Sequence, residues 1–168
     1  MNHYSMTLAC ALAVPVSLLA QSPAAEAKQA YNGIKNNLTK MADKMPEEHY
    51  SFKPVPEIRT FGQLVAHVAD SQGRTCAAAK GDTAPASAAK MTAKAELVEA
   101  LKASFAMCDA AFEAMSDANA NEAIKSPRGA RSRLMTLAGV TTHSNEEYGY
   151  MAVYLRLKGI VPPSSEGR

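Results

Sequence analysis

Residues 92–115 read TAKAELVEALKASFAMCDAAFEAM, and this stretch decides the fold class. Its large apolar residues recur at intervals of four, four, three, four and three, which keeps them on one side of an α-helix. These residues are Leu97, Leu101, Phe105, Cys108, Phe112 and Met115. The remainder is rich in alanine, lysine and glutamate, which lose little conformational freedom in a helix. The stretch therefore predicts a core-facing helix with Thr92 as its N-cap.

Three further segments carry helical patterns. They run from Ser22-Pro23 to Pro46, from Thr60 to Gly81, and from about Arg131 to Lys158. Ser22 followed by proline is typical of a helix start, and Gln63 is placed to complete a capping box with Thr60. Gly159 suits the left-handed position after the last helix. Because no segment alternates like a strand, we expect an all-α fold, a four-helix bundle with long connections.

Composition limits the classes of function. The chain has 168 residues, of which 47% are hydrophobic and 20% are charged, a balance typical of one globular domain. Its formal net charge is only +2, and no basic cluster contains interleaved aromatic residues. Nucleic acid is therefore not an expected partner.

The N-terminus resembles an export signal. Residues 6–20, MTLACALAVPVSLLA, are apolar, uncharged and too short to span a bilayer as a helix. Ala20 before Gln21 is an acceptable signal-peptidase site, although residues 1–5 lack the usual lysine or arginine. Pro15 argues against the alternative, a backward extension of the first helix.

We therefore predict a signal peptide over residues 1–21 and one domain over residues 22–168. The mature protein is then periplasmic or secreted, with no stable membrane insertion after signal cleavage. If the N-terminal segment is not a signal, the expected location is cytoplasmic.

Polar residues interrupt the apolar stripes of two helices. His67 lies at or beside the buried seam of its helix, between Leu64 and Val68. His143 and Glu147 are four residues apart, so they project from one face of the last helix. This pair can span a divalent ion, and a third ligand from a neighbouring helix would complete one face of the coordination sphere. The alternative is a surface ion pair together with a core histidine bonded to a backbone carbonyl.

Other polar residues near these positions have weaker claims. Asp70 would orient the His67 imidazole only if it faced the last helix, and solvation on the helix surface is the favoured interpretation. Tyr148, Tyr150 and Tyr154 are interpreted mainly as core or cavity-lining residues.

Three motifs taken together resemble the DinB-like family. They are MPEEHYSFKPVPEIRTFGQLVAHVAD at 45–70, CAAAKG at 76–81 and HSNEEYGYMAVYLRLKGIVPPSS at 143–165. They occur in the family's order and cover nearly all of the mature chain. The resemblance implies a four-helix bundle with up-down-down-up topology.

The resemblance also implies a metal site, with one histidine on the second helix and a His-x-x-x-His pair on the fourth. The matching positions are His67, His143 and Glu147, so this chain has glutamate where the family usually has histidine. Two histidines and a carboxylate remain a sound ligand set for Zn, Ni, Fe or Mn. The carboxylate would shift the preference toward harder ions, act as a base, or mark a site that has decayed.

Two kinds of function follow from the resemblance. One is a metal-dependent hydrolase or thiol transferase that acts on a small-molecule substrate. The alternative is a non-catalytic metal-binding, ligand-binding or structural bundle with a degenerate site. Family bundles often form homodimers, so a second copy of the chain is an expected partner.

The implied topology also bears on the cysteines. Cys76 and Cys108 each lie 16 residues beyond the expected caps, Thr60 and Thr92. Since the family's second and third helices run parallel, both cysteines would lie at the same height. They would then form a disulfide in an oxidising compartment, or else remain two small buried thiols.

Overall fold

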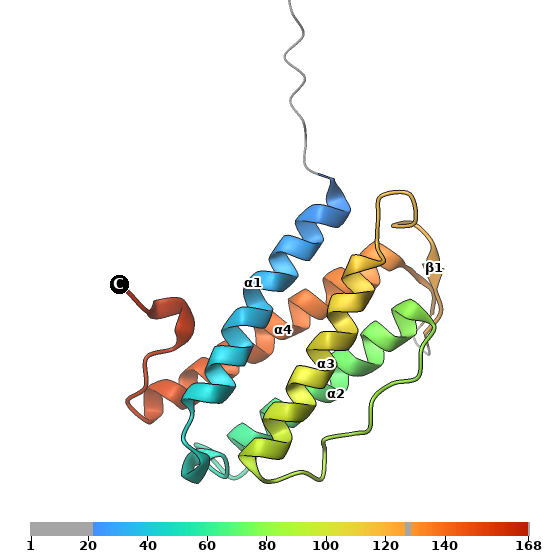
Figure 1. The fold of residues 1–168 in the computed structure, drawn as a ribbon. Coiled ribbons are helices and arrows are strands. Elements are labelled where there is room, and N and C mark those ends of the chain that lie inside the picture. The colour runs from blue at the N-terminus through green and yellow to red at the C-terminus, as the bar shows by residue number, and fades with distance from the viewer. Residues whose placement is uncertain (1–21, 127–128, 168) are drawn as a thin grey trace, which may run out of the picture.

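The computed structural model describes residues 22–126 and 129–167, which form a bundle of four long helices (Figure 1). The helices are α1 (Pro23–Lys44), α2 (Phe61–Lys80), α3 (Lys94–Glu113) and α4 (Arg133–Leu157). Short 3-10 helices η1 (Glu47–His49) and η2 (Pro163–Ser165) follow α1 and α4. Strands β1 (Ala123–Ile124) and β2 (Arg131–Ser132) pair antiparallel between α3 and α4. The expected all-α fold is confirmed, whereas the predicted signal peptide lies outside the described residues.

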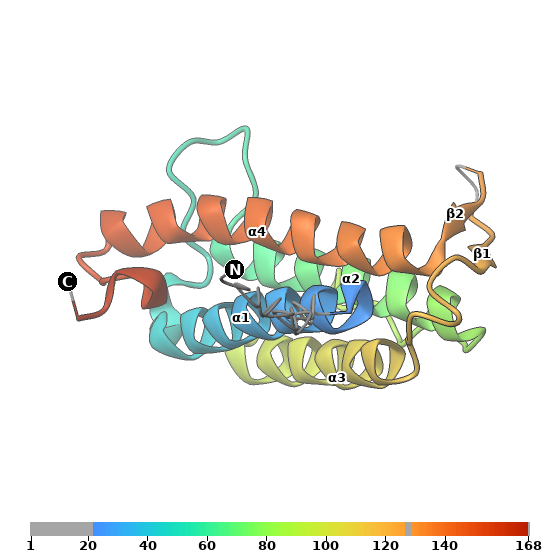
Figure 2. The ribbon, with the colours of Figure 1, turned by 90° about the horizontal axis from the view of Figure 1, so that it is seen from above.

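Contacts at the helix ends fix the direction of each helix. The backbone N–H of Ala24, in the first turn of α1, donates to Asp117 just beyond α3 at 3.0 Å. At the other end of the bundle, Lys44 near the end of α1 donates to the carbonyl of Val161 just after α4 at 3.0 Å. Hence α1 and α4 run in one direction and α3 in the other. The N–H of Gly62, in the first turn of α2, donates to the carbonyl of Tyr50 shortly after α1 at 2.8 Å, so α2 also runs opposite to α1. The result is the up-down-down-up topology (Figures 1 and 2).

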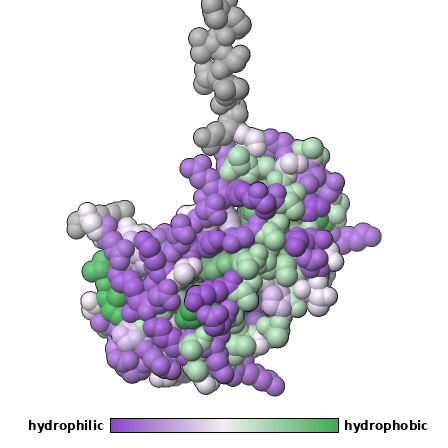
Figure 3. Space-filling view, viewed as in Figure 1, coloured by the Kyte–Doolittle hydropathy of each residue, from purple (hydrophilic) through white to green (hydrophobic). Residues whose placement is uncertain are grey.

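The core consists of the apolar stripes that the four helices turn inward. Its most completely buried members include Leu38, Met41, Phe61, Val65, Leu97, Phe112, Leu137 and Leu155. The outer surface over α1 and α3 is largely hydrophilic, with pale apolar areas between the polar side chains (Figure 3). Within the described ranges, no helix is both long enough and apolar enough to cross a bilayer.

The helix ends follow the predicted capping signals. Ser22 accepts a hydrogen bond from the N–H of Ala25 at 3.1 Å, which starts α1. Thr60 and Gln63 form both bonds of the capping box that starts α2. Gly81 ends α2 with a φ of 79°, in the left-handed region that glycine tolerates best.

Two predicted boundaries are wrong. The N-cap of α3 is Ala93 rather than Thr92, and no side chain within residues 22–126 and 129–167 caps this helix. Instead, Lys94 anchors the start of α3 by donating to the carbonyls of Asp43 and Met45 at the end of α1. The last helix begins at Arg133 rather than Arg131, because residues 131–132 pair with β1. A strand of two residues is too short to produce a recognisable alternation.

A disulfide joins α2 to α3. Cys76 and Cys108 are bonded, with their Cα atoms 5.0 Å apart. The two helices run parallel, so residues near the end of each lie at the same height, as the family topology implied. Of the two alternatives for these cysteines, the structure has the disulfide.

Candidate metal centre

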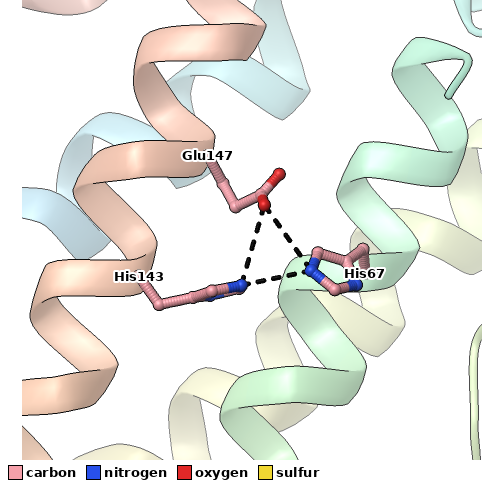
Figure 4. A group of neighbouring side chains, drawn as sticks. All are labelled: His67, His143 and Glu147. Carbon is pink, nitrogen blue, oxygen red and sulfur yellow. Dashed lines mark hydrogen bonds and ion pairs between the residues drawn. The ribbon is translucent and has the colours of Figure 1, made fainter. Parts of the chain in front are cut away.

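Three polar side chains from two helices point toward one another between α2 and α4 (Figure 4). Nε2 of His67 is 3.1 Å from Nε2 of His143. Oε1 of Glu147 is 3.5 Å from Nε2 of His67 and 3.6 Å from Nε2 of His143. Donor atoms roughly 2.0–2.2 Å from one shared ion lie about 3.0–3.5 Å apart. The group therefore has the dimensions of a single-ion site.

The local sequence explains why these residues meet. The capping box fixes the start of α2, so His67 lies two turns into the helix, beside the buried residues Leu64 and Val68. On α4, the one-turn spacing of His143 and Glu147 places both on the face that packs toward α2. The antiparallel packing of α2 and α4 then brings the three side chains to one height.

The site is closed at its base and open at its rim. The Glu147 side chain is only 5% exposed, whereas the side chains of His67 and His143 are each 29% exposed. The carboxylate thus lies inside the bundle, and the two rings face the solvent side. A small molecule can approach the rings without displacing the carboxylate.

Burial shifts the protonation equilibria of two of these groups. Burial lowers the pKa of His67, and the charges of Arg59 and His143 lower it further. The neutral imidazole that results is the form that binds metal ions. Burial also raises the pKa of the Glu147 carboxyl, although His143 and Arg59 oppose the increase. The protein groups around Glu147 therefore do not fully replace the hydration that its charged carboxylate loses on burial.

One oxygen of the Glu147 carboxylate indicates that the site suits a cation. Oε2 is buried and has no hydrogen-bond partner within the described part of the chain. A buried carboxylate oxygen without a donor is costly, and a bound cation would compensate it. Two imidazole nitrogens and a carboxylate are donors that Zn, Ni, Fe and Mn accept. The residues present therefore fit a divalent ion.

The acidic residue expected near His67 has a different role. Asp70 accepts hydrogen bonds from the hydroxyl of Ser87 at 2.5 Å and from the N–H of Ala88 at 2.7 Å. It therefore fastens the connection between α2 and α3 to the side of α2. It neither orients the imidazole nor lies free in solvent, because its bonding partners come from a loop that sequence periodicity does not place.

The three tyrosines of α4 divide between packing and surface roles. Tyr154 is buried, and its hydroxyl donates to the carbonyl of Arg59 at 2.6 Å. The hydroxyl of Tyr148 bonds to Ser164, which fastens the chain after α4. Tyr150 is 52% exposed and does not pack in the core, contrary to the prediction.

Arg59 is a residue near the site that sequence reasoning missed. It is exposed, lies directly before the N-cap of α2, and its charge acts on both His67 and Glu147. It lies in a proline-containing loop with no periodicity, so its place in the sequence gave no signal. Its position depends on the hydrogen bond from Tyr154, which is a tertiary contact.

Comparison with solved structures identifies similar folds. A DinB-like protein from Bacillus cereus ATCC 10987 has a TM-score of 0.71 at 18% identity, covering 82% of this chain and 93% of that one. A conserved protein from Enterococcus faecalis has a TM-score of 0.67 at 16% identity, covering 82% and 98%. A DinB-like protein from Bacillus subtilis has a TM-score of 0.65 at 18% identity, covering 80% and 92%.

Comparison of the sequence itself identifies the family. No curated protein matches the sequence. The family model described as the DinB superfamily matches residues 30–151, well over half of the chain. This match agrees with the helical bundle and with its structural relatives. The chain belongs to the DinB superfamily.

Proposed function

We propose that this protein is an exported metalloprotein that binds one divalent ion through His67, His143 and Glu147 and uses it to hydrolyse a small-molecule substrate. One observation carries the proposal: donor atoms from two helices converge beside a buried carboxylate oxygen that has no hydrogen-bond partner among the described residues. A surface ion pair would not bury Glu147, and a structural core histidine would have a protein hydrogen-bond partner rather than a second imidazole.

Each protein group has a distinct task in this proposal. A divalent ion, when bound, would act as a Lewis acid in the site. His67 and His143 hold it through Nε2 in their neutral forms, and their exposed edges leave one side accessible to substrate. Glu147 supplies the negative charge from the buried side, where water does not compete for it.

Hydrolysis is favoured over thiol transfer by the compartment that we propose. The disulfide between Cys76 and Cys108 suits an oxidising compartment, as does the predicted signal peptide. Low-molecular-weight thiols are kept reduced mainly in the cytosol, so a thiol substrate fits this location less well. N-terminal sequencing of the protein recovered from the periplasm or medium tests the export proposal, and a mature chain that begins near Gln21 or Ser22 would support it.

Metal stoichiometry tests the ligand assignment. Protein purified without a histidine tag, stripped with chelator and titrated with Zn²⁺, Ni²⁺, Fe²⁺ or Mn²⁺, should bind one ion per chain. His67→Ala and Glu147→Gln should each weaken binding by at least about tenfold, as expected for loss of one ligand. His49→Ala is the matched control, because His49 lies on η1 and outside the group. Equal affinity in all four proteins would refute the assignment.

Turnover separates the hydrolase from a non-catalytic metal protein. The metal-loaded wild type should hydrolyse at least one member of a panel of esters and amides, and His67→Ala should abolish that activity. Thiol-transfer substrates form the second arm of the panel. Metal binding without any turnover would leave a binding protein and remove the hydrolase proposal.

A further inference from the structure

The outer face of α4 carries an exposed apolar stripe. Seven large apolar side chains of the described residues are strongly exposed, and five of them lie on α4 or shortly after it. These five are between 50% and 55% exposed and comprise Met135, Tyr150, Val153, Leu157 and Val161. Tyr150, Val153 and Leu157 follow one another at intervals of three and four residues, so they share one side of the helix. This stripe lies apart from the buried face with which α4 packs on α1 and α2.

The loop over residues 51–59 flanks this stripe. It arches outward past α4 (Figure 2), and the hydroxyl of Tyr154 ties it to the helix by donating to the carbonyl of Arg59 at 2.6 Å. The other two strongly exposed apolar side chains, Val55 and Ile58, lie on this loop. A gathering of exposed apolar side chains of this kind is typical of a surface that binds another molecule.

Two opposite charges border the stripe, and neither has a counterion. Glu146 accepts a hydrogen bond from the hydroxyl of Tyr150 at 3.1 Å, and Arg156 donates one to the hydroxyl of Ser165 at 2.9 Å. Within the described part of the chain, neither Glu146 nor Arg156 belongs to an ion pair. They are ten residues apart, which is about 15 Å along the helix axis and too far for a pair between them.

An antiparallel copy of the same helix would pair these charges. A two-fold axis at the level of Met151 places each residue opposite the one that lies equally far from Met151 on the other side. Glu146 and Arg156 are each five residues from Met151, so each glutamate would lie opposite an arginine of the other copy. Gly149 and Val153 are each two residues from it. A Cβ on Gly149 would meet no described atom within 4 Å, which leaves room there for the Val153 side chain of the second copy.

We infer that the outer face of α4 binds the same face of a second copy of this chain, with the two helices antiparallel and centred at the level of Met151. The inference is independent of the proposed metal site. Its two halves are self-complementary, because the apolar stripe meets itself and each unpaired charge meets its opposite.

The size of the face predicts a weak, reversible dimer. α4 has 25 residues, so it is about 37 Å long and, with its side chains, about 10–12 Å wide. One face therefore covers roughly 400 Å², and two faces with the flanking loops bury about 1,000 Å². This area is at the low end for specific protein interfaces. We expect a dissociation constant in the micromolar range.

Sedimentation velocity over a series of protein concentrations measures the dimer, with a chelator present so that metal ions play no part. The wild type should pass from monomer to dimer as the concentration rises. Val153→Glu should weaken dimerisation at least about tenfold, because the new carboxylate would be buried without a partner. Ala106→Glu is the matched control, because Ala106 is exposed on α3 and away from α4. This control should dimerise like the wild type.

Charge exchange tests the antiparallel pairing. Glu146→Arg and Arg156→Glu each turn both pairs of the dimer into pairs of like charge, so each variant should dimerise at least about tenfold more weakly than the wild type. An equal mixture of the two variants should dimerise again, because every arginine then lies opposite a glutamate. Both residues are exposed, and circular dichroism should show unchanged helix content in each variant.

Three results would overturn the inference. The first is a wild type that remains monomeric at every concentration. The second is a dimer that Val153→Glu leaves intact, since another surface would then join the copies. The third is a mixture of the two charge variants that associates no better than either variant alone. None of these results bears on the metal site, which is tested separately by metal stoichiometry.

Discussion

Reduction of the disulfide between Cys76 and Cys108 is predicted to destabilise the bundle strongly. Both cysteines are fully buried, so the reduced thiols keep most of their packing contacts in the folded state. The main effect is then on the unfolded chain, which gains freedom when the cross-link opens. The helices joined by the bond are otherwise connected by a long irregular segment, residues 81–93.

The size of the effect follows from the length of the closed loop. The cysteines are 32 residues apart in sequence. For a loop of that length, the chain-entropy relation gives a loss of about 3.7 kcal/mol. In a domain of about 150 residues each kcal/mol changes Tm by roughly 2–4 °C. The reduced protein should therefore melt about 7–15 °C below the oxidised protein.

Urea unfolding with and without a phosphine reductant measures this difference in one and the same chain. A Cys76→Ala/Cys108→Ala variant is the control, because it should unfold identically in both conditions. Equal stability of wild type with and without reductant would refute the reasoning. So would two titratable thiols in the unfolded, unreduced mature protein, since that result removes the bond itself.

Three smaller changes test other parts of the fold. With a chelator present, Glu147→Gln should stabilise the protein at pH 8 but hardly at pH 4. Burial raises the pKa of the Glu147 carboxyl, so the wild type loses stability as the pH rises through that raised value. An equal effect at both pH values in urea unfolding would contradict this. Thr60→Ala should cost about 1 kcal/mol by removing the capping box with Gln63, and an unchanged Tm would argue against it. Gly62→Ala should cost about 1–3 kcal/mol of stability, because the added Cβ would lie 3.2 Å from the carbonyl oxygen of Tyr50. Unchanged stability would show that the packing around Gly62 has room for a methyl group.

The fold was largely predictable because its signals are local. Ser22, Thr60 and Gly81 mark helix ends through bonds or dihedral angles confined to a few residues. The start of α3 was not predictable in this way, because Lys94 is held by carbonyls of α1, about fifty residues away. Boundaries that depend on tertiary contacts carry no local pattern.

The candidate site was predictable only in part. The spacing of His143 and Glu147 placed them on one face of α4, but spacing alone could not bring His67 to them from another helix. That step needed the family topology. The bonding partners of Asp70 and the position of Arg59 depended on loops, whose course is set by the hydrogen bonds from Ala88 to Asp70 and from Tyr154 to Arg59.

The central claim is that the imidazoles of His67 and His143, on different helices, bind the same ion. Nuclear magnetic resonance of protein labelled with ¹⁵N at histidine tests it most directly during titration of the metal-free protein with Zn²⁺. We predict that the Nε2 signals of His67 and His143 shift together and stop changing at one equivalent, while those of His49 stay in place. Zinc bound with no change at His67 and His143, or with a shift of His49 instead, would contradict the account.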